Sequence, residues 1–386
     1  MLYLFWIPVA LIFHSYVLYP SILWLLAIWH PNNKHTYATS DSLPIVTILM
    51  AVYNEEAVIH KKIESIFNTT YPLKKLQVIV GSDSSTDRTD QILTQLSKEH
   101  ASLHFLKFQR RGKSNTINEL VDMAAGEIII STDANVIFDT NTIFELVKHF
   151  KNPTIGLVDS RVSNTGVIKS GISIPESTYI NREVHIKNRE GRVWGSMMGP
   201  FGGCFAIRKS CYKKVPPTFL VDDFFICMKV IEQKLSTINS MDAIVYEDVS
   251  NYIDEEFRRK VRISIGAFQN LWHFKRLLWP PYKGRSFAFL SHKVIRWFGP
   301  FLIALALGAN MVLAMQSNFY QILLILFLAS FLISLIDFLL KRINIHITFV
   351  RFITHFYGMN LALLLGFFKF VKGVKSNVWQ PTQRNQ

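Results

Sequence analysis

The sequence contains little charge and few cysteines, and both shortages narrow the class of protein. Charged residues make up 18% of the 386 residues, whereas soluble domains average about 25%, so an ordinary soluble protein is not expected. The three cysteines, Cys204, Cys211 and Cys227, form no Cys-x-x-Cys pair, and no histidine cluster accompanies them. We therefore expect neither a zinc site nor disulfide bonds. The cysteines suit a protein in a reducing compartment.

Two common nucleotide-binding motifs are also missing. No Gly-x-Gly-x-x-Gly follows an apolar run, so a Rossmann dinucleotide site has no support. The stretch from Arg110 to Ser114 looks like the end of a P-loop, but the motif needs a glycine five residues before Gly112, and Lys107 stands there. A P-loop is therefore excluded as well.

Acidic residues are scarce beside basic ones. The chain has 42 Lys and Arg against 28 Asp and Glu, a net charge of +14. Nucleic acid and anionic lipid are both partners that such a surplus would suit. Because 49% of the residues are hydrophobic, the lipid explanation and the excess of basic residues in cytoplasmic loops fit better. We expect a lipid bilayer as a partner and no nucleic acid.

Several runs without charge are long enough to cross a membrane. Residues 2–29 contain no Asp, Glu, Lys or Arg, and a spanning helix needs about 20 residues. The run lacks a basic start and a small-residue cleavage site, which favours a retained anchor over a signal peptide. Residues 297–336 are likewise free of charge and suit two spans. A third run, 347–368, contains Arg351 and His355, so it either spans, re-enters or lies at the interface.

The distribution of basic residues predicts the orientation. Lys34 is the first charged residue and follows the first apolar run, which places the N-terminus outside and Lys34 in the cytoplasm. Between Trp272 and Arg296, aromatic and basic residues alternate. This pattern suits helices lying on the inner leaflet, although an amphipathic helix of the globular domain would also show it. We predict a multi-pass protein of the cell (inner or plasma) membrane with its central domain in the cytoplasm.

The central part of the chain alternates apolar strands with amphipathic helices. We expect strands at 45–50, 77–80, 103–108 and 127–132, and helices at 55–68 and 113–124. Alternation at this spacing predicts an α/β fold with a mainly parallel sheet and helices on both faces. Ligands bind beyond the carboxyl ends of such strands. Since Glu55, Asp83 and Asp133 each follow a strand, they should converge on one edge.

Short motifs along this region resemble those of family-2 glycosyltransferases. In chain order they are Val46–Glu56, Gly81–Thr89, Gly112–Asn118, Asp133-Ala-Asn135, Gly202–Arg208, Asp222-Asp223 and Arg259–Ile263. Each is weak alone, but their order and spacing are similar to those of the family from about residue 44 to residue 275. The flanking apolar segments resemble those of processive polysaccharide synthases of the hyaluronan, cellulose and poly-N-acetylglucosamine synthase kind.

The resemblance implies a GT-A fold and an inverting, single-displacement transfer from a nucleotide-diphosphate sugar. It implies donor-binding roles for Tyr53, Asn54, Glu55, Asp83, Lys113 and Asp133. Asp133 and Asn135 would bind a divalent metal, Mg²⁺ or Mn²⁺, which stabilises the leaving nucleoside diphosphate. Inversion needs one catalytic base, expected to be Asp223 with Asp222 beside it. The acceptor-binding residues would be Gly202, Gly203, Arg259 and Arg262.

Two positions depart from the family pattern. Asn135 stands where the family carries a second Asp, and an uncharged amide oxygen lowers the expected metal affinity. Ile263 stands where processive members carry a Trp that would stack on the acceptor sugar. Either processivity is lost, or this contact moves to Trp272 or Trp379, so repeated and single transfer both stay open.

These observations predict a hexosyltransferase that extends an exopolysaccharide or capsular polysaccharide at the inner membrane surface. The alternative is a single-sugar transferase to a polyprenyl phosphate or glycolipid. A transporter or channel subunit is disfavoured. The polar residues of such a protein should lie within the spans, whereas those of this chain cluster in the central domain. The partners of the predicted transferase would be a nucleotide-sugar donor and a glycan acceptor. If polymer is extruded, we also expect a homodimer or an export partner. The expected divisions are an anchor (1–30), a cytoplasmic GT-A domain (35–264), interfacial helices (265–296), transmembrane segments (297–370) and a basic tail (371–386).

Overall fold

The computed structural model divides the chain into two compact units, each described separately below. It describes residues 1–166, 173–248, 253–342 and 347–374. The unit that we call the helical unit comprises residues 1–25, 167–179 and 250–373. The sheet unit comprises residues 26–166, 180–249 and 374–386. Ser376, Trp379 and most of the basic tail lie outside the described residues.

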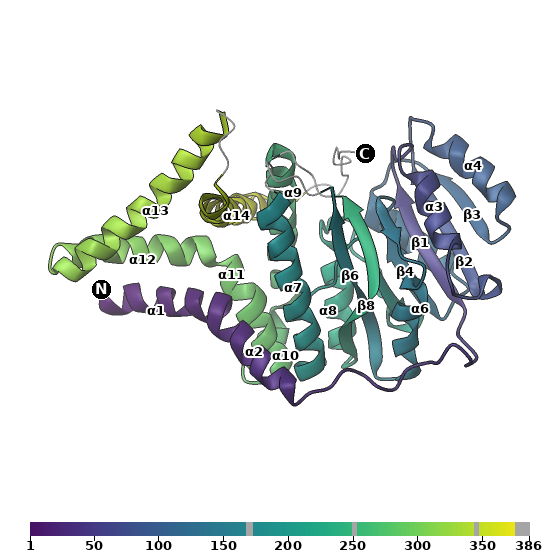
Figure 1. Ribbon diagram of the computed structural model, residues 1–386, viewed down its shortest axis with the longest axis horizontal. Coiled ribbons are helices and arrows are strands. Elements are labelled where there is room, and N and C mark those ends of the chain that lie inside the picture. The colour runs from purple at the N-terminus through teal and green to yellow at the C-terminus, as the bar shows by residue number, and fades with distance from the viewer. Residues whose placement is uncertain (167–172, 249–252, 343–346, 375–386) are drawn as a thin grey trace. The chain divides into compact units, whose positions relative to one another are not determined.

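The sheet unit is built on a mixed eight-stranded sheet, with the strand order β3-β2-β1-β4-β7-β6-β8-β5 (Figure 1). The strands are β1 (Val46–Val52), β2 (Leu76–Asp83), β3 (Leu103–Phe108), β4 (Ile128–Thr132), β5 (Val136–Phe138), β6 (Ile155–Thr165), β7 (Cys204–Arg208) and β8 (Ser236–Asp248). The first four strands in chain order run parallel to one another, as predicted. The other half is mixed, because β7 runs antiparallel to both β4 and β6.

Helices pack against this sheet and complete its core. They are α3 (Ile59–Phe67), α4 (Thr89–Glu99), α5 (Lys113–Met123), α6 (Thr142–Val147), α8 (Asp222–Glu232) and the later part of α7 (Ser173–Trp194). Every residue of β1 is buried, as a central strand covered on both faces should be. On α3, Ile59, Ile63 and Ile66 form one buried face. The helix α5 begins directly after Gly112, whose φ of 88° favours glycine.

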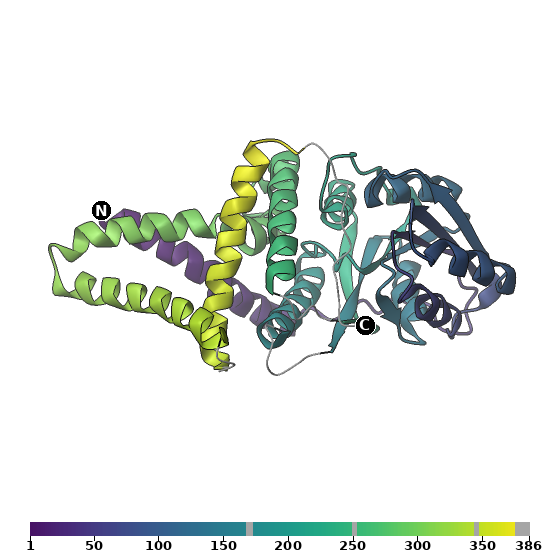
Figure 2. The same ribbon diagram turned by 90° about the horizontal axis from the view of Figure 1, so that it is seen from above.

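The helical unit contains helices from both ends of the chain, and several of them are long and apolar. They are α1 (Leu2–Phe13), α2 (Tyr19–Ile28), α9 (Ile253–Phe274), α10 (Gly284–Ala288), α11 (Ile295–Trp297), α12 (Gly299–Ala314), α13 (Asn318–Arg342) and α14 (Thr348–Val371). A π-helical turn joins α1 to α2. Within this unit α1 lies beside α12, and α14 lies beside α9 (Figure 2).

Among the described residues, three helices are long and apolar enough to cross a membrane. They cover Leu2–Ile28, Asn318–Asp337 and Val350–Val371. A fourth candidate is a helix pair, Gly284–Trp297 with Gly299–Ala314, bent by 63° at its break. Helices apolar enough to span a membrane therefore flank the sheet unit, as predicted. The run at 297–336 divides into α12 and α13. Of these two helices, α13 contains a candidate span by itself, whereas α12 is a candidate only together with Gly284–Trp297.

The stretch predicted to lie at the membrane interface exposes large aromatic side chains. Trp272, Trp279 and Tyr282 are 67%, 78% and 82% exposed. The ammonium of Lys275 lies 3.8 Å from the centroid of the Trp272 ring. Aromatic rings beside basic groups are typical of helices at a lipid headgroup boundary, so the interfacial role stays our prediction for these residues.

Candidate active site

Two loops at the carboxyl ends of β1 and β2 are hydrogen-bonded to each other. Asn54 adopts a φ of 54°, a left-handed conformation that asparagine tolerates better than most residues. Its side-chain oxygen accepts a hydrogen bond from the Thr86 N–H at 2.8 Å. The Glu55 N–H donates to Thr89 Oγ1 at 2.8 Å. The predicted donor residue Asn54 therefore shapes the rim of the site through its side chain.

Asp83 ends β2 as a fully buried carboxylate. It accepts hydrogen bonds from the Arg111 N–H at 2.7 Å, the Gly112 N–H at 3.0 Å and Arg110 Nη1 at 2.7 Å. The Arg110 guanidinium in turn lies 3.4 Å from the centroid of the Tyr53 ring. The structure thus links Tyr53 and Asp83, two of the predicted donor residues, through an arginine that was not among the predicted site residues. The only sequence signal for Arg110 was the basic pair before Gly112.

A lysine and three aspartates meet beyond the end of β4. Lys113 Nζ lies 2.7 Å from Asp133 Oδ1. Burial would lower the pKa of Lys113, but the charges of Asp133, Asp222 and Asp223 outweigh it and raise that pKa. Burial and the charge of Asp222 raise the pKa of Asp223 to about 6, against the opposing effects of the Phe224 N–H and Lys113. The four groups therefore lie within range of one another's charges.

The Gly202-Gly203 loop closes one side of this cluster. Because β7 pairs with β4, Cys204 lies opposite Thr132, and the Gly203 carbonyl accepts a hydrogen bond from the Asp133 N–H at 3.0 Å. A Cβ atom on Gly202 would lie only 2.6 Å from Asp223 Oδ2. The glycine is therefore needed for the loop to approach the carboxylate, beyond any role in a turn.

The residues around Asp133 fit a divalent metal that is shared with a ligand. The Asn135 amide nitrogen donates to Glu247 Oε1 at 3.2 Å, so the amide oxygen is the atom of this side chain that could bind a metal. In the part of the chain that the structure describes, no group of three or more His, Cys, Asp or Glu is arranged to hold a metal. One carboxylate and one amide oxygen suit a Mg²⁺-like ion that takes its other ligands from phosphates and water. They do not suit a metal cage made by the protein alone.

Arg259 and Arg262, which the resemblance assigns to acceptor binding, lie on α9 of the helical unit. Arg259 Nε donates to Glu256 Oε2 at 3.0 Å, while Arg262 is exposed. Nearby, the buried Glu176 carboxylate accepts hydrogen bonds from Lys260 Nζ at 2.6 Å and His355 Nε2 at 3.0 Å. Burial would raise the pKa of Glu176, but the charges of Lys260 and Arg259 and the hydrogen bond from His355 outweigh it and lower that pKa. Sequence reasoning missed this cluster because its members are far apart in the chain.

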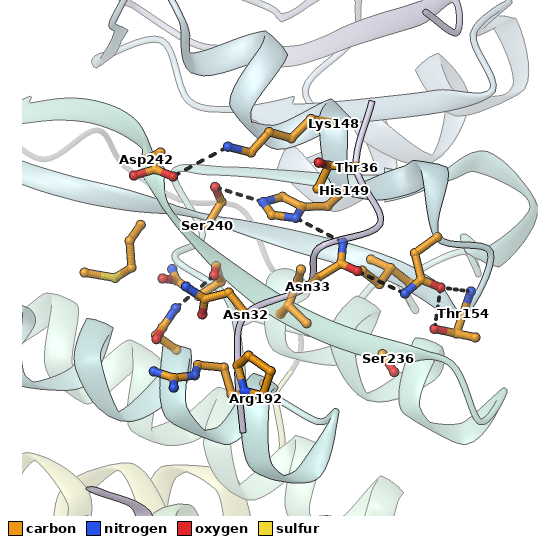
Figure 3. A pocket seen from close by; sticks show the side chains of 18 residues that line it. Asn32, Asn33, Thr36, Lys148, His149, Thr154, Arg192, Ser236, Ser240 and Asp242 are labelled. Atoms are coloured by element: carbon orange, nitrogen blue, oxygen red, sulfur yellow. Dashed lines mark hydrogen bonds and ion pairs between the residues drawn. The ribbon is translucent and has the colours of Figure 1, made fainter. Parts of the chain in front are cut away.

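A polar cavity of about 390 Å³ lies at the opposite end of the sheet, beside the starts of β6 and β8 (Figure 3). Its side chains are largely bonded to one another. His149 Nε2 lies 3.3 Å from Ser240 Oγ, the Asn33 amide lies 3.3 Å from His149 Nδ1, and Lys148 pairs with Asp242 at 3.5 Å. None of the predicted site residues lines it, so it is separate from the candidate active site.

Comparison with known proteins tests the family that the motifs of this site resemble. Residues 47–215 match the family described as "Glycosyl transferase family 2". This segment, which is less than half of the chain, therefore forms a glycosyltransferase domain of family 2, as the motifs predicted. The matched segment contains the predicted donor residues and the Gly202-Gly203 loop.

Two curated relatives show the range of the family around this chain. Beta-monoglucosyldiacylglycerol synthase of Nostoc sp. (strain PCC 7120) is 37% identical over 123 residues, which cover 31% of this chain and 26% of the relative. Poly-beta-1,6-N-acetyl-D-glucosamine synthase of Staphylococcus epidermidis is 24% identical over 287 residues, which cover 70% of this chain and 68% of the relative. The chain thus spans about a quarter of the first relative and about two thirds of the second.

One solved structure is similar over almost the whole chain. It is the mannosyltransferase PcManGT from Pyrobaculum calidifontis, in complex with GDP-Man and Mn²⁺. The match has a TM-score of 0.73 at 21% sequence identity and covers 95% of this chain and 99% of the other. The predicted fold is therefore confirmed.

Proposed function

We propose that this protein transfers a sugar, with inversion, from a nucleotide-diphosphate sugar to an acceptor at the inner membrane surface. The observation that carries the proposal is the convergence of Lys113, Asp133 and Asp223 beside the Gly202 loop at one edge of the sheet. A cation, a metal-binding carboxylate and a separate carboxylate of raised pKa are the groups that a single displacement needs. The candidate membrane helices favour an acceptor at a bilayer.

The donor would lie along the carboxyl ends of β1, β2 and β4. The Tyr53 ring and the Arg110 guanidinium stacked on it supply flat surfaces for a base. Asp83 would accept a hydrogen bond from the base, in exchange for one of its present donors. Lys113, held by Asp133, would offset diphosphate charge. When bound at Asp133 and Asn135, a divalent ion would add charge stabilisation to the leaving nucleoside diphosphate.

Asp223 would act as the base of the transfer. Its carboxylate takes the proton of the attacking hydroxyl while the oxygen bonds to the anomeric carbon and the bond to the diphosphate breaks. A single displacement inverts the configuration at that carbon. A pKa of about 6 leaves the group mostly ionised near neutral pH yet more basic than an ordinary aspartate, as general-base catalysis favours.

For the acceptor, we propose a growing polysaccharide. The support is the poly-N-acetylglucosamine synthase, which matches 70% of this chain, including parts outside the family-2 segment. A glycolipid acceptor is the second candidate, favoured by the 37% identity to a glycolipid synthase over 123 residues. Arg259 is engaged by Glu256, so its predicted acceptor contact would require that pair to open or be shared.

Washed membranes given labelled nucleotide sugars would separate these candidates. We expect label in insoluble polymer, with long chains beside unused acceptor at low turnover. Label confined to the lipid extract, or acceptors extended by one sugar, would favour the glycolipid candidate. Membranes carrying Asp223→Asn serve as the matched control, since they should bind donor without forming either product. No turnover by the wild type with any nucleotide sugar would overturn the proposal.

A further inference from the structure

Lys62 is a buried lysine that none of the assigned roles explains. It lies on the core-facing side of α3 with no exposed surface, whereas its neighbour Lys61 is exposed. Burial lowers the pKa of Lys62 to about 7, with the charge of Asp133 acting in the opposite direction. A buried cation is costly unless its hydrogen bonds are satisfied. An apolar residue would fill this position of α3 at lower cost if packing were its only task.

The contacts of Lys62 bracket the turn that carries the predicted metal ligands. Its Nζ donates to Thr132 Oγ1 at 2.9 Å and to the Val136 carbonyl. The ammonium also lies 3.5 Å from the centroid of the Phe138 ring. Thr132 directly precedes Asp133, and Val136 directly follows Asn135. One side chain therefore holds both ends of the turn from its buried side.

The bond to Thr132 also fixes where that hydroxyl points. A lysine ammonium only donates, so Thr132 Oγ1 accepts from it and must direct its own hydrogen elsewhere. Thr132 Oγ1 donates to the Gly203 carbonyl at 3.0 Å, which also accepts from the Asp133 N–H at 3.0 Å. Lys62, Thr132 and Gly203 thus form a continuous hydrogen-bonded chain from α3 to the loop beside Asp223.

We propose that Lys62 is a positioning residue that sets the 133–135 turn, and with it Asp133 and Asn135, for binding the donor diphosphate and its metal. The inference rests on the proposed function of Asp133. Lys62 acts through backbone placement, since its hydrogen bonds reach Thr132 and Val136 rather than either ligand. Groups that orient metal ligands in this way typically change metal affinity or activity by about 10- to 100-fold when removed.

The test compares Lys62→Met with Lys61→Met, the same substitution at the adjacent exposed position. Binding of UDP and GDP is titrated with and without Mn²⁺, and hydrogen exchange is followed in peptides that cover 131–138. For Lys62→Met we expect Mn²⁺-dependent nucleotide affinity to fall about 10- to 100-fold and the Asp133 and Val136 amides to exchange faster. Lys61→Met should match the wild type in both measurements.

A second pair of variants keeps the test decisive if Lys62→Met does not fold. Thr132→Val removes the hydroxyl that links Lys62 to Gly203, while Thr132→Ser keeps it. Loss of affinity in Thr132→Val with wild-type affinity in Thr132→Ser supports the proposal. Wild-type Mn²⁺-dependent affinity in a folded Lys62→Met, or in Thr132→Val, overturns it. A wild-type protein that binds neither diphosphate contradicts the proposed function instead.

Discussion

At the scale of single residues, the proposal depends on Asp223, the second of two adjacent aspartates. Asp223 has a pKa raised to about 6, chiefly by burial and then by the charge of Asp222. A carboxyl group whose surroundings raise its pKa is a recurring sign of an acid–base role. The geometry of Gly202, whose added Cβ would meet Asp223 Oδ2 at 2.6 Å, points to the same carboxylate.

We therefore predict an acidic limb near pH 6 in the dependence of kcat/KM on pH. A base works only when deprotonated, so activity should fall as the pH drops through the pKa of Asp223. Asp222→Asn removes the neighbouring negative charge and should move the limb to lower pH. Asp242→Asn, at an exposed carboxylate beside the separate polar cavity, is the control. A limb that stays in place in Asp222→Asn would contradict the assignment.

Some residues of the site could be placed from the sequence, and others could not. The carboxylates at strand ends, Asp83 and Asp133, could be placed at one edge because parallel strands end together. The positions of Arg110 and Lys62 could not be predicted. Arg110 contacts Asp83 across 27 residues of sequence, and Lys62 contacts Thr132 across 70 residues. Nothing local distinguishes a buried lysine from an exposed one on an amphipathic helix.

At the scale of elements, the site is assembled by a reversal of direction within the sheet. The parallel half was predictable from the alternation of strands and helices. The antiparallel strand β7 was not, yet its pairing with β4 brings Gly203 against Asp133. The loop before β7 therefore lies beside Asp133, and its Gly202 lies beside Asp223 at the start of α8. Strand periodicity does not predict this reversal.

Gly202→Ala should test this closeness. The new methyl group would collide with Asp223 Oδ2 at 2.6 Å, so the loop or the carboxylate must shift. Because a misplacement of about 1 Å can cost roughly 100-fold in rate, we expect kcat to fall by that order with little loss of donor binding. Gly308→Ala, where nothing lies within 4 Å of the new atom, should leave kcat unchanged. Equal kcat in both variants would show that the close approach is not required.

At the scale of the whole molecule, hydropathy predicted the helical segments well because lipid requires long apolar helices. The candidate span Leu2–Ile28 lies within the charge-free run 2–29. The candidate span Asn318–Asp337 lies within the run 297–336 except for its last residue. The third, Val350–Val371, includes Arg351 and His355, and His355 forms a hydrogen bond with Glu176. Charge patterns give the orientation of such helices only as a statistical rule, so it is a matter for experiment.

We predict that the sheet unit faces the cytoplasm. Tyr3→Cys, Asn32→Cys and Ser376→Cys are made one at a time, and intact cells are treated with an impermeant thiol reagent. The native cysteines are buried, so background labelling should be low. The Tyr3→Cys protein carries its new thiol near the start of the first span and should be labelled. In Asn32→Cys the thiol follows that span and should be protected until the cells are opened.

Two outcomes of this labelling experiment decide the topology. Labelling of Asn32→Cys from outside the intact cells would reverse the predicted orientation. The result for Ser376→Cys shows whether the last apolar helix crosses the membrane.

The most direct test of the central claim is to measure donor binding and sugar transfer side by side in purified wild type, Asp133→Ala and Asp223→Asn. We expect Asp133→Ala to lose metal-dependent donor binding. Asp223→Asn should bind donor as the wild type does, while transfer falls by roughly 10²- to 10⁴-fold, the contribution of a positioned base. Transfer at the wild-type rate by Asp223→Asn would contradict the account.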